Sequence, residues 1–170
     1  MRKPKEKPTV DSFIQSYAEQ GGLNIVKKTT GQKRIYYLSG AITNDPHAEL
    51  KFALAEEVIK REGNYAINPM RSCPAGMKWE DAIVRCLGMI NQLGTFYRAS
   101  LNYLGLIKGL PLPALLLIDP KGRPVESRGV KLEKGIALAN GIPVVQMCGD
   151  WENTLLCAIS EREYEMEKTK

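Results

Sequence analysis

The chain has 170 residues, of which 44% are hydrophobic and 25% charged, and its formal net charge is +5. This length suits one domain with a full core, and this composition is that of a globular protein rather than a disordered or fibrous one. No apolar run approaches the length needed to cross a bilayer, and residues 1–4 lead into no signal-peptide core. We therefore expect a cytoplasmic protein with no membrane partner.

The cysteines and the histidine argue against a bound metal. The four cysteines form no Cys-x-x-Cys pair, and the chain has one histidine. These residues make no plausible zinc set, so the sequence predicts no metal site and no cofactor. We expect the thiols to be reduced and mostly buried.

The positive charge belongs to the N-terminal part of the chain. Residues 1–34 carry eight Lys and Arg against three Asp and Glu, whereas the remaining residues are balanced. We expect residues 1–30 to be a basic arm with a short helix, and residues 31–170 to be a single α/β domain. A basic arm can contact nucleic acid, but such arms more often only aid solubility, and we favour the second interpretation.

Strand and helix patterns alternate along the rest of the chain. In the first half of the chain we expect a helix over 9–19, an edge strand or hairpin arm over 23–28, a strand over 34–38, a helix over 46–61, a strand over 65–67 and a loop over 70–77. In the second half we expect a helix over 79–93 with a second helix or a continuation over 95–108, a strand over 113–118, a helix over 130–140, a strand over 142–147 and a helix over 150–167. This order predicts a parallel sheet with helices on both faces and right-handed crossovers.

Three loops should meet at the carboxyl edge of this sheet, where open α/β sheets bind ligands. They cover residues 39–46, 68–77 and 119–129. Ser39, Gly40 and Ala41 offer backbone N–H groups to a phosphate or sugar oxygen, although the same residues also suit an ordinary turn. Asp119 suits the first position of a type I turn as well as it suits a catalytic acid.

Glu133 is the most informative residue of the helix over 130–140. Helical spacing places it on one face with Val130, Ile136 and Ala137, the face expected to lie against the sheet. Burying an ionised carboxylate on such a face costs free energy, so we expect this group either to be paired or to have a function. The alternative is a solvent-facing glutamate that interacts with the helix dipole.

Two segments together resemble a known family. Residues 36–43 read Tyr-Tyr-Leu-Ser-Gly-Ala-Ile-Thr and are followed by a helix and Asn68-Pro69; residues 127–141 contain Ser-Arg-Gly-Val, Glu133 and a final glycine. Both segments are similar to the signatures of the nucleoside 2-deoxyribosyltransferase-like superfamily, in its phage-associated, largely uncharacterised branch. The resemblance covers roughly residues 35–145.

The resemblance implies a flavodoxin-like three-layer sandwich with a mostly parallel sheet, and a nucleoside or nucleotide ligand. It implies that Glu133 attacks the anomeric carbon and displaces the nucleobase, as in a retaining glycosidase. By the same comparison, the ligand-binding positions would be Tyr37, Ser39, Gly40, Ala41, Asn68, Ser127 and Gly129. Arg128 is added for the chemistry of its guanidinium, which could neutralise a 5′-phosphate, and not for the resemblance.

The chain also departs from the family pattern. Pro113 and Ala114 stand where the family has an acidic residue, so Asp119 would have to supply a relocated carboxylate. Two hypotheses follow: an N-glycosidase or deoxyribosyltransferase, or a non-catalytic relative that binds a nucleotide or a protein in the same pocket. A second carboxylate close to Glu133 would favour the enzyme, whereas a salt bridge from Glu133 to Arg128 or Lys131 would favour the binder.

The segment over 79–108 carries more apolar residues than one helical stripe requires. A helix of this kind is either fully buried or part of an interface. We therefore expect a homodimer or a higher homo-oligomer.

Overall fold

The computed structural model describes residues 8–23, 31–102, 110–121 and 127–170, without the side chains of residues 100–102. The expected basic tail, most of the expected strand over 23–28 and the end of the segment over 95–108 lie outside these ranges. None of the helices in the described ranges is long and apolar enough to span a membrane.

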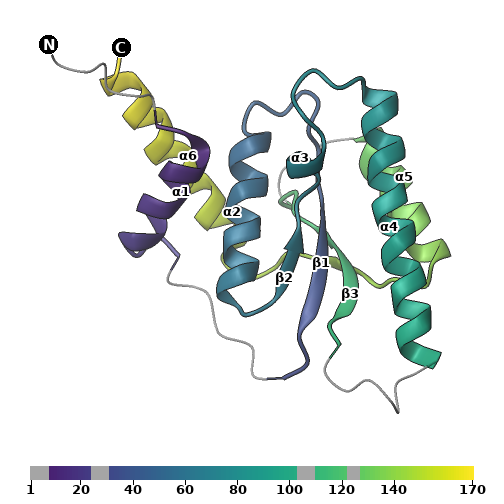
Figure 1. The fold of residues 1–170 in the computed structure, drawn as a ribbon. Coiled ribbons are helices and arrows are strands. Elements are labelled where there is room, and N and C mark those ends of the chain that lie inside the picture. Colours follow the sequence, from purple (N-terminus) through teal and green to yellow (C-terminus); the bar gives the residue numbers. More distant parts are fainter. Residues whose placement is uncertain (1–7, 24–30, 103–109, 122–126) are drawn as a thin grey trace, which may run out of the picture.

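The centre of the fold is a four-stranded sheet whose described strands are all parallel (Figure 1). In sequence order the strands are β1 (Arg34–Ser39), β2 (Tyr65–Ile67), β3 (Leu112–Leu117) and β4 (Val144–Gln146). Their spatial order is β2-β1-β3-β4, so β3 is a central strand, as its continuous apolar run predicts. This is the strand order of a flavodoxin-like sheet, and the predicted fold class is confirmed.

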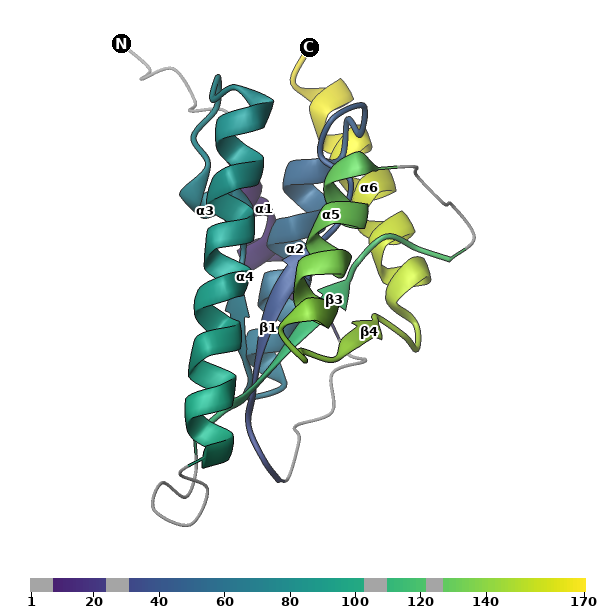
Figure 2. The ribbon, with the colours of Figure 1, turned by 90° about the vertical axis from the view of Figure 1, so that its right-hand side faces the viewer.

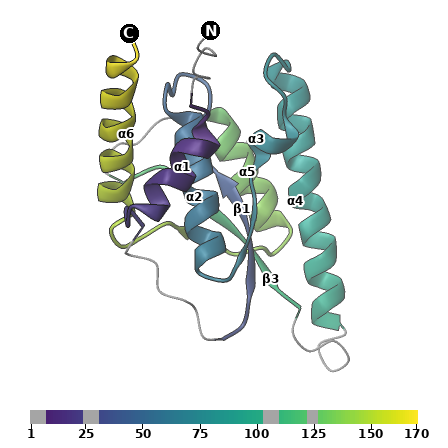
Figure 3. The same cartoon turned by 60° about the vertical axis from the view of Figure 1, so that its left-hand side comes forward.

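Helices cover both faces of the sheet, which gives three layers (Figure 2). The helices are α1 (Val10–Glu19), α2 (Ala48–Arg61), α3 (Pro69–Ser72), α4 (Trp79–Asn102), α5 (Arg128–Ala139) and α6 (Trp151–Lys168). One face is covered by α2, with α1 lying across it and α6 beside it (Figure 3). The other face is covered by α4 and α5, which run side by side.

The alternation of side chains along the strands divides the core between the two faces. Leu38 and Leu116 pack with α1, α2 and α6, whereas Tyr37 and Leu115 pack with α4 and α5. Because side chains two positions apart share a face, Ser39 lies on the same side as Tyr37, toward α5. The alternation of side chains along β1 therefore directs both Tyr37 and Ser39 toward α5.

Several element boundaries differ from the sequence prediction. The segment over 79–102 is one continuous helix, and the expected loop over 70–77 overlaps the short helix α3. α3 begins because the Asn68 side chain accepts a hydrogen bond from the backbone N–H of Met70 and Pro69 occupies the first turn. α1 matches the expected helix and buries its apolar side against α2, in the same core cluster.

Candidate active site

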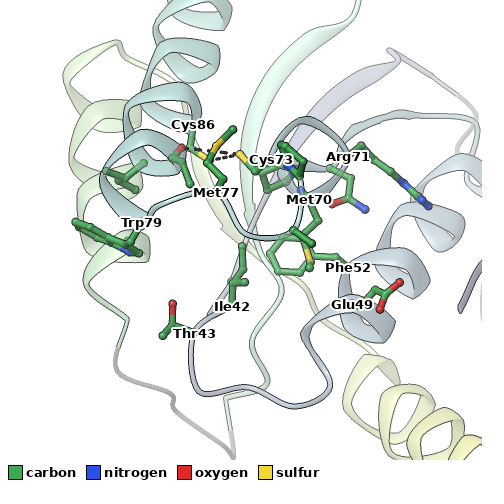
Figure 4. Close-up of a pocket in the computed structure, with 18 of the residues that line it drawn as sticks. Ile42, Thr43, Glu49, Phe52, Met70, Arg71, Cys73, Met77, Trp79 and Cys86 are labelled. Atoms are coloured by element: carbon green, nitrogen blue, oxygen red, sulfur yellow. Dashed lines mark hydrogen bonds between the residues drawn. The ribbon is translucent and has the colours of Figure 1, made fainter.

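The candidate site lies where the strand order reverses, between β1 and β3. A cavity of about 510 Å³ opens there, and α2, α3, α4, α5 and the loop after β1 contribute to its walls. Phe52 and Met70 lie on one side of the cavity and Met77 and Trp79 on the other (Figure 4). An apolar cavity with a few polar groups at a switch point is the usual form of a small-molecule site in this fold.

Glu133 lies on the cavity wall and is only 6% exposed. α5 starts at Arg128 because the Ser127 hydroxyl caps it by accepting a hydrogen bond of 3.3 Å from the N–H of Val130. Glu133 then comes on the face toward the sheet, where its Oε1 accepts a hydrogen bond of 3.2 Å from the Ser39 hydroxyl. The alternative of a solvent-facing glutamate is therefore wrong.

Burial raises the pKa of Glu133 to about 7, although Tyr37 and Ser39 partly offset this effect. Desolvation disfavours the charged form of a carboxyl, and two neighbouring hydroxyls favour it. Neither Arg128 nor Lys131 forms an ion pair with Glu133 in the part of the chain that the structure describes. The carboxyl group can therefore change its protonation state near neutral pH, as acid–base and nucleophilic groups in enzymes often do.

The Tyr37 hydroxyl belongs to the same group of side chains. Tyr37 is 1% exposed, and its hydroxyl is the buried side-chain polar atom that makes no hydrogen bond within 3.5 Å among the described residues. Burial, and then the charge of Glu133, raise the pKa of Tyr37 far above its ordinary value. A buried hydroxyl without a partner is costly, and a small movement would bring this one into hydrogen-bond reach of Glu133. Tyr37 and Ser39 lie behind Glu133 and do not themselves line the described cavity.

Asp119 has a different environment from Glu133. Its Oδ1 accepts a hydrogen bond of 2.6 Å from Lys51 Nζ, and its Oδ2 accepts one of 2.8 Å from the backbone N–H of Ala41. Lys51 is 2% exposed and also donates to Asp45 and to the carbonyl oxygen of Ala41. This buried network ties the loop after β1 to the end of β3, and Asp119 does not line the described cavity.

A second network of hydrogen bonds supports the part of the cavity wall that α2 and α3 form. The Asn68 side-chain amide donates to Glu56 Oε2 at 3.0 Å, and Arg71 Nε donates to the same oxygen at 3.1 Å. Arg71 also forms a bidentate pair with Asp11 of α1. Burial alone would raise the pKa of Glu56, but Asn68, Lys60 and Arg71 together hold that pKa below its ordinary value. Asn68 is thus a structural support of the cavity that also contributes to its lining.

Of the remaining predicted site residues, Gly40, Ser127 and Gly129 line the cavity together with Glu133. Ala41 is buried outside the described cavity, and its N–H is bonded to Asp119. Arg128 is exposed, and its guanidinium lies 5.1 Å from the ring centroid of Trp79, in cation–π geometry.

Lys51 and Trp79 were not predicted as functional residues. For Lys51 the sequence held a signal, because helical spacing places this lysine on the apolar side of α2, near Leu54 and Val58. Trp79 opens α4 directly after the loop over 73–78, and nothing in its sequence context separates a cavity residue from a core residue. Among the described residues, no group of three or more His, Cys, Asp and Glu side chains could hold a metal ion.

Comparison with known families finds a match over the first part of the α/β domain. Residues 34–98 match a family model described as a domain of unknown function (DUF4406). The matched part contains β1, α2, β2, α3 and most of α4, and so includes Tyr37, Ser39 and Asn68 but not Glu133. No curated protein and no solved structure matched the chain.

Proposed function

We propose that the protein binds a nucleoside or nucleotide in this cavity and cleaves the bond between base and sugar, as an N-glycosidase or a 2-deoxyribosyltransferase. The observation that carries the proposal is the buried carboxylate of Glu133, which lines a cavity and accepts a hydrogen bond from Ser39. The sequence resemblance to nucleoside 2-deoxyribosyltransferases supports the choice of substrate class.

In the proposed reaction a carboxylate oxygen of Glu133 bonds to the anomeric carbon while the bond from that carbon to the nucleobase breaks. The base leaves as its anion and takes a proton from water, and a glycosyl ester of Glu133 remains. Water, which gives up a proton to the solvent, or the nitrogen of a second base then attacks the same carbon and releases the carboxylate, so the configuration is retained. Positive charge develops on the sugar in the transition state, and a buried anion nearby stabilises that charge more strongly than it would in water.

The other site residues have supporting roles in this proposal. The Ser39 hydroxyl orients the carboxylate, and the Tyr37 hydroxyl lies beside Glu133, where it can bond the carboxylate. The apolar walls formed by Phe52, Met70 and Trp79 suit the faces of a nucleobase. Asp119 serves as a positioning group, because Lys51 and the Ala41 N–H occupy its oxygens.

The engagement of Asp119 is also the observation that favours the second candidate, a protein that binds a nucleotide without cleaving it. A relative that lacks a free second carboxylate keeps the cavity but loses the group that would protonate the departing base. Binding without turnover would then be the function of the cavity.

The test is a screen of ribo- and 2-deoxyribonucleosides and their 5′-phosphates, with released base measured by chromatography and binding measured by thermal shift. We expect base release by the wild-type chain and a loss of several orders of magnitude in Glu133→Gln, as for other nucleophile knockouts. Glu165→Gln is the matched control, since Glu165 is an exposed residue of α6. Binding without release would support the second candidate, and release at the wild-type rate by Glu133→Gln would end the nucleophile proposal.

A further inference from the structure

We propose that Cys73 and Cys86 are a redox-active dithiol that closes to a disulfide on the wall of the candidate active-site cavity. Their sulfur atoms lie 4.0 Å apart, and both residues line the cavity (Figure 4). Cys73 follows α3 as its C-cap residue, whereas Cys86 lies inside α4. The two thiols therefore come from different elements and meet only in the folded chain.

The pair differs in environment from the other two cysteines. Cys148 and Cys157 are exposed, whereas Cys73 is half-buried and Cys86 is buried, so the expectation of mostly buried thiols is wrong. Both thiols lie on the cavity wall, but Cys73 is the more exposed of the two, while Cys86 packs in the core with Tyr37. This arrangement suits a pair in which one thiol reacts first and the second resolves the intermediate.

Closing the bond needs a local movement. The two sulfurs must approach from 4.0 Å to about 2.0 Å, the length of a disulfide bond. Cys73 has an extended backbone (φ −113°, ψ 96°) outside the helices, so its side chain can rotate without opening a helical turn. What is lost is a weak contact of 3.9 Å from its sulfur to the carbonyl oxygen of Ala82.

The chemistry is thiol–disulfide exchange with a small-molecule disulfide as the oxidant. The thiolate of Cys73 attacks one sulfur of that molecule, which leaves a mixed disulfide and releases the first small thiol. The sulfur of Cys86 then attacks the Cys73 sulfur, and the second small thiol leaves with the proton of Cys86. The protein has lost two hydrogen atoms and the small disulfide has gained them.

Burial raises the pKa of Cys86 to about 12, so this thiol is protonated at neutral pH and Cys73 is the thiol that reacts first. Oxidation would tie Cys73 and the cavity residues that follow it, including Met77, to α4. It would also remove the Cys86 thiol from the side of Tyr37 and Glu133. The state of the dithiol would thus change the wall of the cavity that faces Glu133.

The experiment uses the full wild-type chain, incubated with oxidised glutathione, alkylated under denaturing conditions and digested with trypsin. Cleavage after Arg71, Lys78, Arg85 and Arg98 puts Cys73 in the peptide 72–78 and Cys86 in the peptide 86–98, whereas Cys148 and Cys157 share the peptide 135–162. We expect a disulfide between the first two peptides, which reduction with dithiothreitol abolishes.

Cys73→Ser is the control variant, and the peptide 86–98 should then carry no link to another peptide of the chain. Separate glutathione adducts on the peptides 72–78 and 86–98, or unmodified thiols on both after prolonged oxidation, would overturn the proposal. The readout is independent of base release, so a failure of the glycosidase proposal would leave this test unchanged.

Discussion

The Ser39 hydroxyl at the end of β1 donates a hydrogen bond of 3.2 Å to the Glu133 carboxylate on α5, although 94 positions separate the two residues. Both side chains are buried, with exposed fractions of 1% and 6%. Water therefore contributes little to the solvation of this carboxylate, and its protonation depends on neighbouring protein groups.

The first prediction concerns the pH dependence of base release. If ionised Glu133 is the nucleophile, kcat/KM should rise with pH through an apparent pKa near 7, the value to which burial raises the pKa of this group. Ser39→Ala removes a hydrogen bond that favours the charged form, so the rising limb should move to higher pH. A profile measured between about pH 5 and pH 9 tests this expectation.

The control for this profile is Ser160→Ala, because Ser160 is an exposed residue of α6. Its rising limb should coincide with that of the wild-type chain. An unchanged midpoint in Ser39→Ala would show that the hydrogen bond does not act on the titrating group.

The second prediction concerns stability. Because the folded-state pKa of Glu133 is raised from 4.5 to about 7, the folded chain holds this proton more tightly than the unfolded chain does. The stability associated with the protonated group is complete below about pH 4.5 and is lost as the pH rises through about 7, by a loss on the order of 3 kcal/mol. Glu133→Gln does not titrate, so above pH 7 we expect it to be more stable than the wild-type chain.

Urea unfolding at pH 5 and pH 8 measures this difference. The gain of Glu133→Gln should be large at pH 8 and small at pH 5, while Glu165→Gln should follow the wild-type chain at both values. A Glu133→Gln protein that loses both activity and stability at pH 8 would contradict the expectation that Glu133 is a functional carboxylate whose ionisation destabilises the fold.

The third prediction concerns the buried lysine. Lys51→Met leaves the carboxylates of Asp45 and Asp119 without their cation, and breaking a buried pair typically costs about 3–5 kcal/mol of unfolding free energy. Although burial acts to raise the pKa of Asp45, the Lys51 hydrogen bond helps to hold that pKa below its ordinary value. The contribution of Asp45 is therefore present above about pH 4 and is lost as the pH falls through its folded pKa.

Lys60→Met is the matched control for this prediction. Lys60 is also on α2 and pairs with Glu56 at 3.0 Å, but its side chain is 56% exposed. Lys60 is solvated, and Glu56 keeps Asn68 and Arg71 as partners when this lysine is removed, so Lys60→Met should cost only about 0.2–1 kcal/mol. Denaturant midpoints should therefore fall much further for Lys51→Met than for Lys60→Met. Equal losses in the two variants would show that the network around Asp119 stabilises the fold no more than the pair of Lys60 with Glu56 does.

Periodicity accounts for what the sequence could predict. The apolar run of β3 predicted a central strand, and the helical spacing of Glu133 with Ala137 predicted a face toward the sheet. Asp119 and Lys51 show the limit of such reasoning, because each residue has its own local pattern but their contact depends on how β3 and α2 pack together. The meeting of Cys73 with Cys86 could not be predicted for the same reason, and α3 was missed because four residues are too few for a periodic signal.

The fourth prediction is association of the chain with itself. Ile90 and Leu93 of α4 are buried in the core, but Val84 on α4 and Leu138 on the neighbouring α5 are 69% and 62% exposed. We expect a homodimer whose interface covers Val84 and Leu138. Light scattering should give twice the 18.9 kDa of one chain at micromolar concentration, and Val84→Lys combined with Leu138→Lys should restore the monomer. A wild-type monomer at that concentration would refute the expectation.

The fifth prediction concerns the close approach of the loop after β1 to the end of β3. A Cβ atom at Gly40 would lie 2.8 Å from Ile118 Cγ1 and 3.4 Å from Asp119 Oδ1. Ile118 is fully buried, so it has little room to move aside. Gly40→Ala should therefore cost about 1–3 kcal/mol of unfolding free energy, as other overpacking changes do. Because Gly40 lines the cavity, ligand affinity should fall as well.

Gly88→Ala is the control, since a Cβ atom at this position of α4 would meet no heavy atom within 4 Å. Alanine in a helix interior loses less backbone entropy on folding than glycine, so this variant should gain roughly 0.5–1 kcal/mol. The two substitutions add the same methyl group, and urea unfolding should show opposite signs. If Gly40→Ala were as stable as the wild-type chain, the loop after β1 would have to be free to move away from Ile118, and the fixed geometry of Ser39 beside Glu133 would no longer follow from the packing.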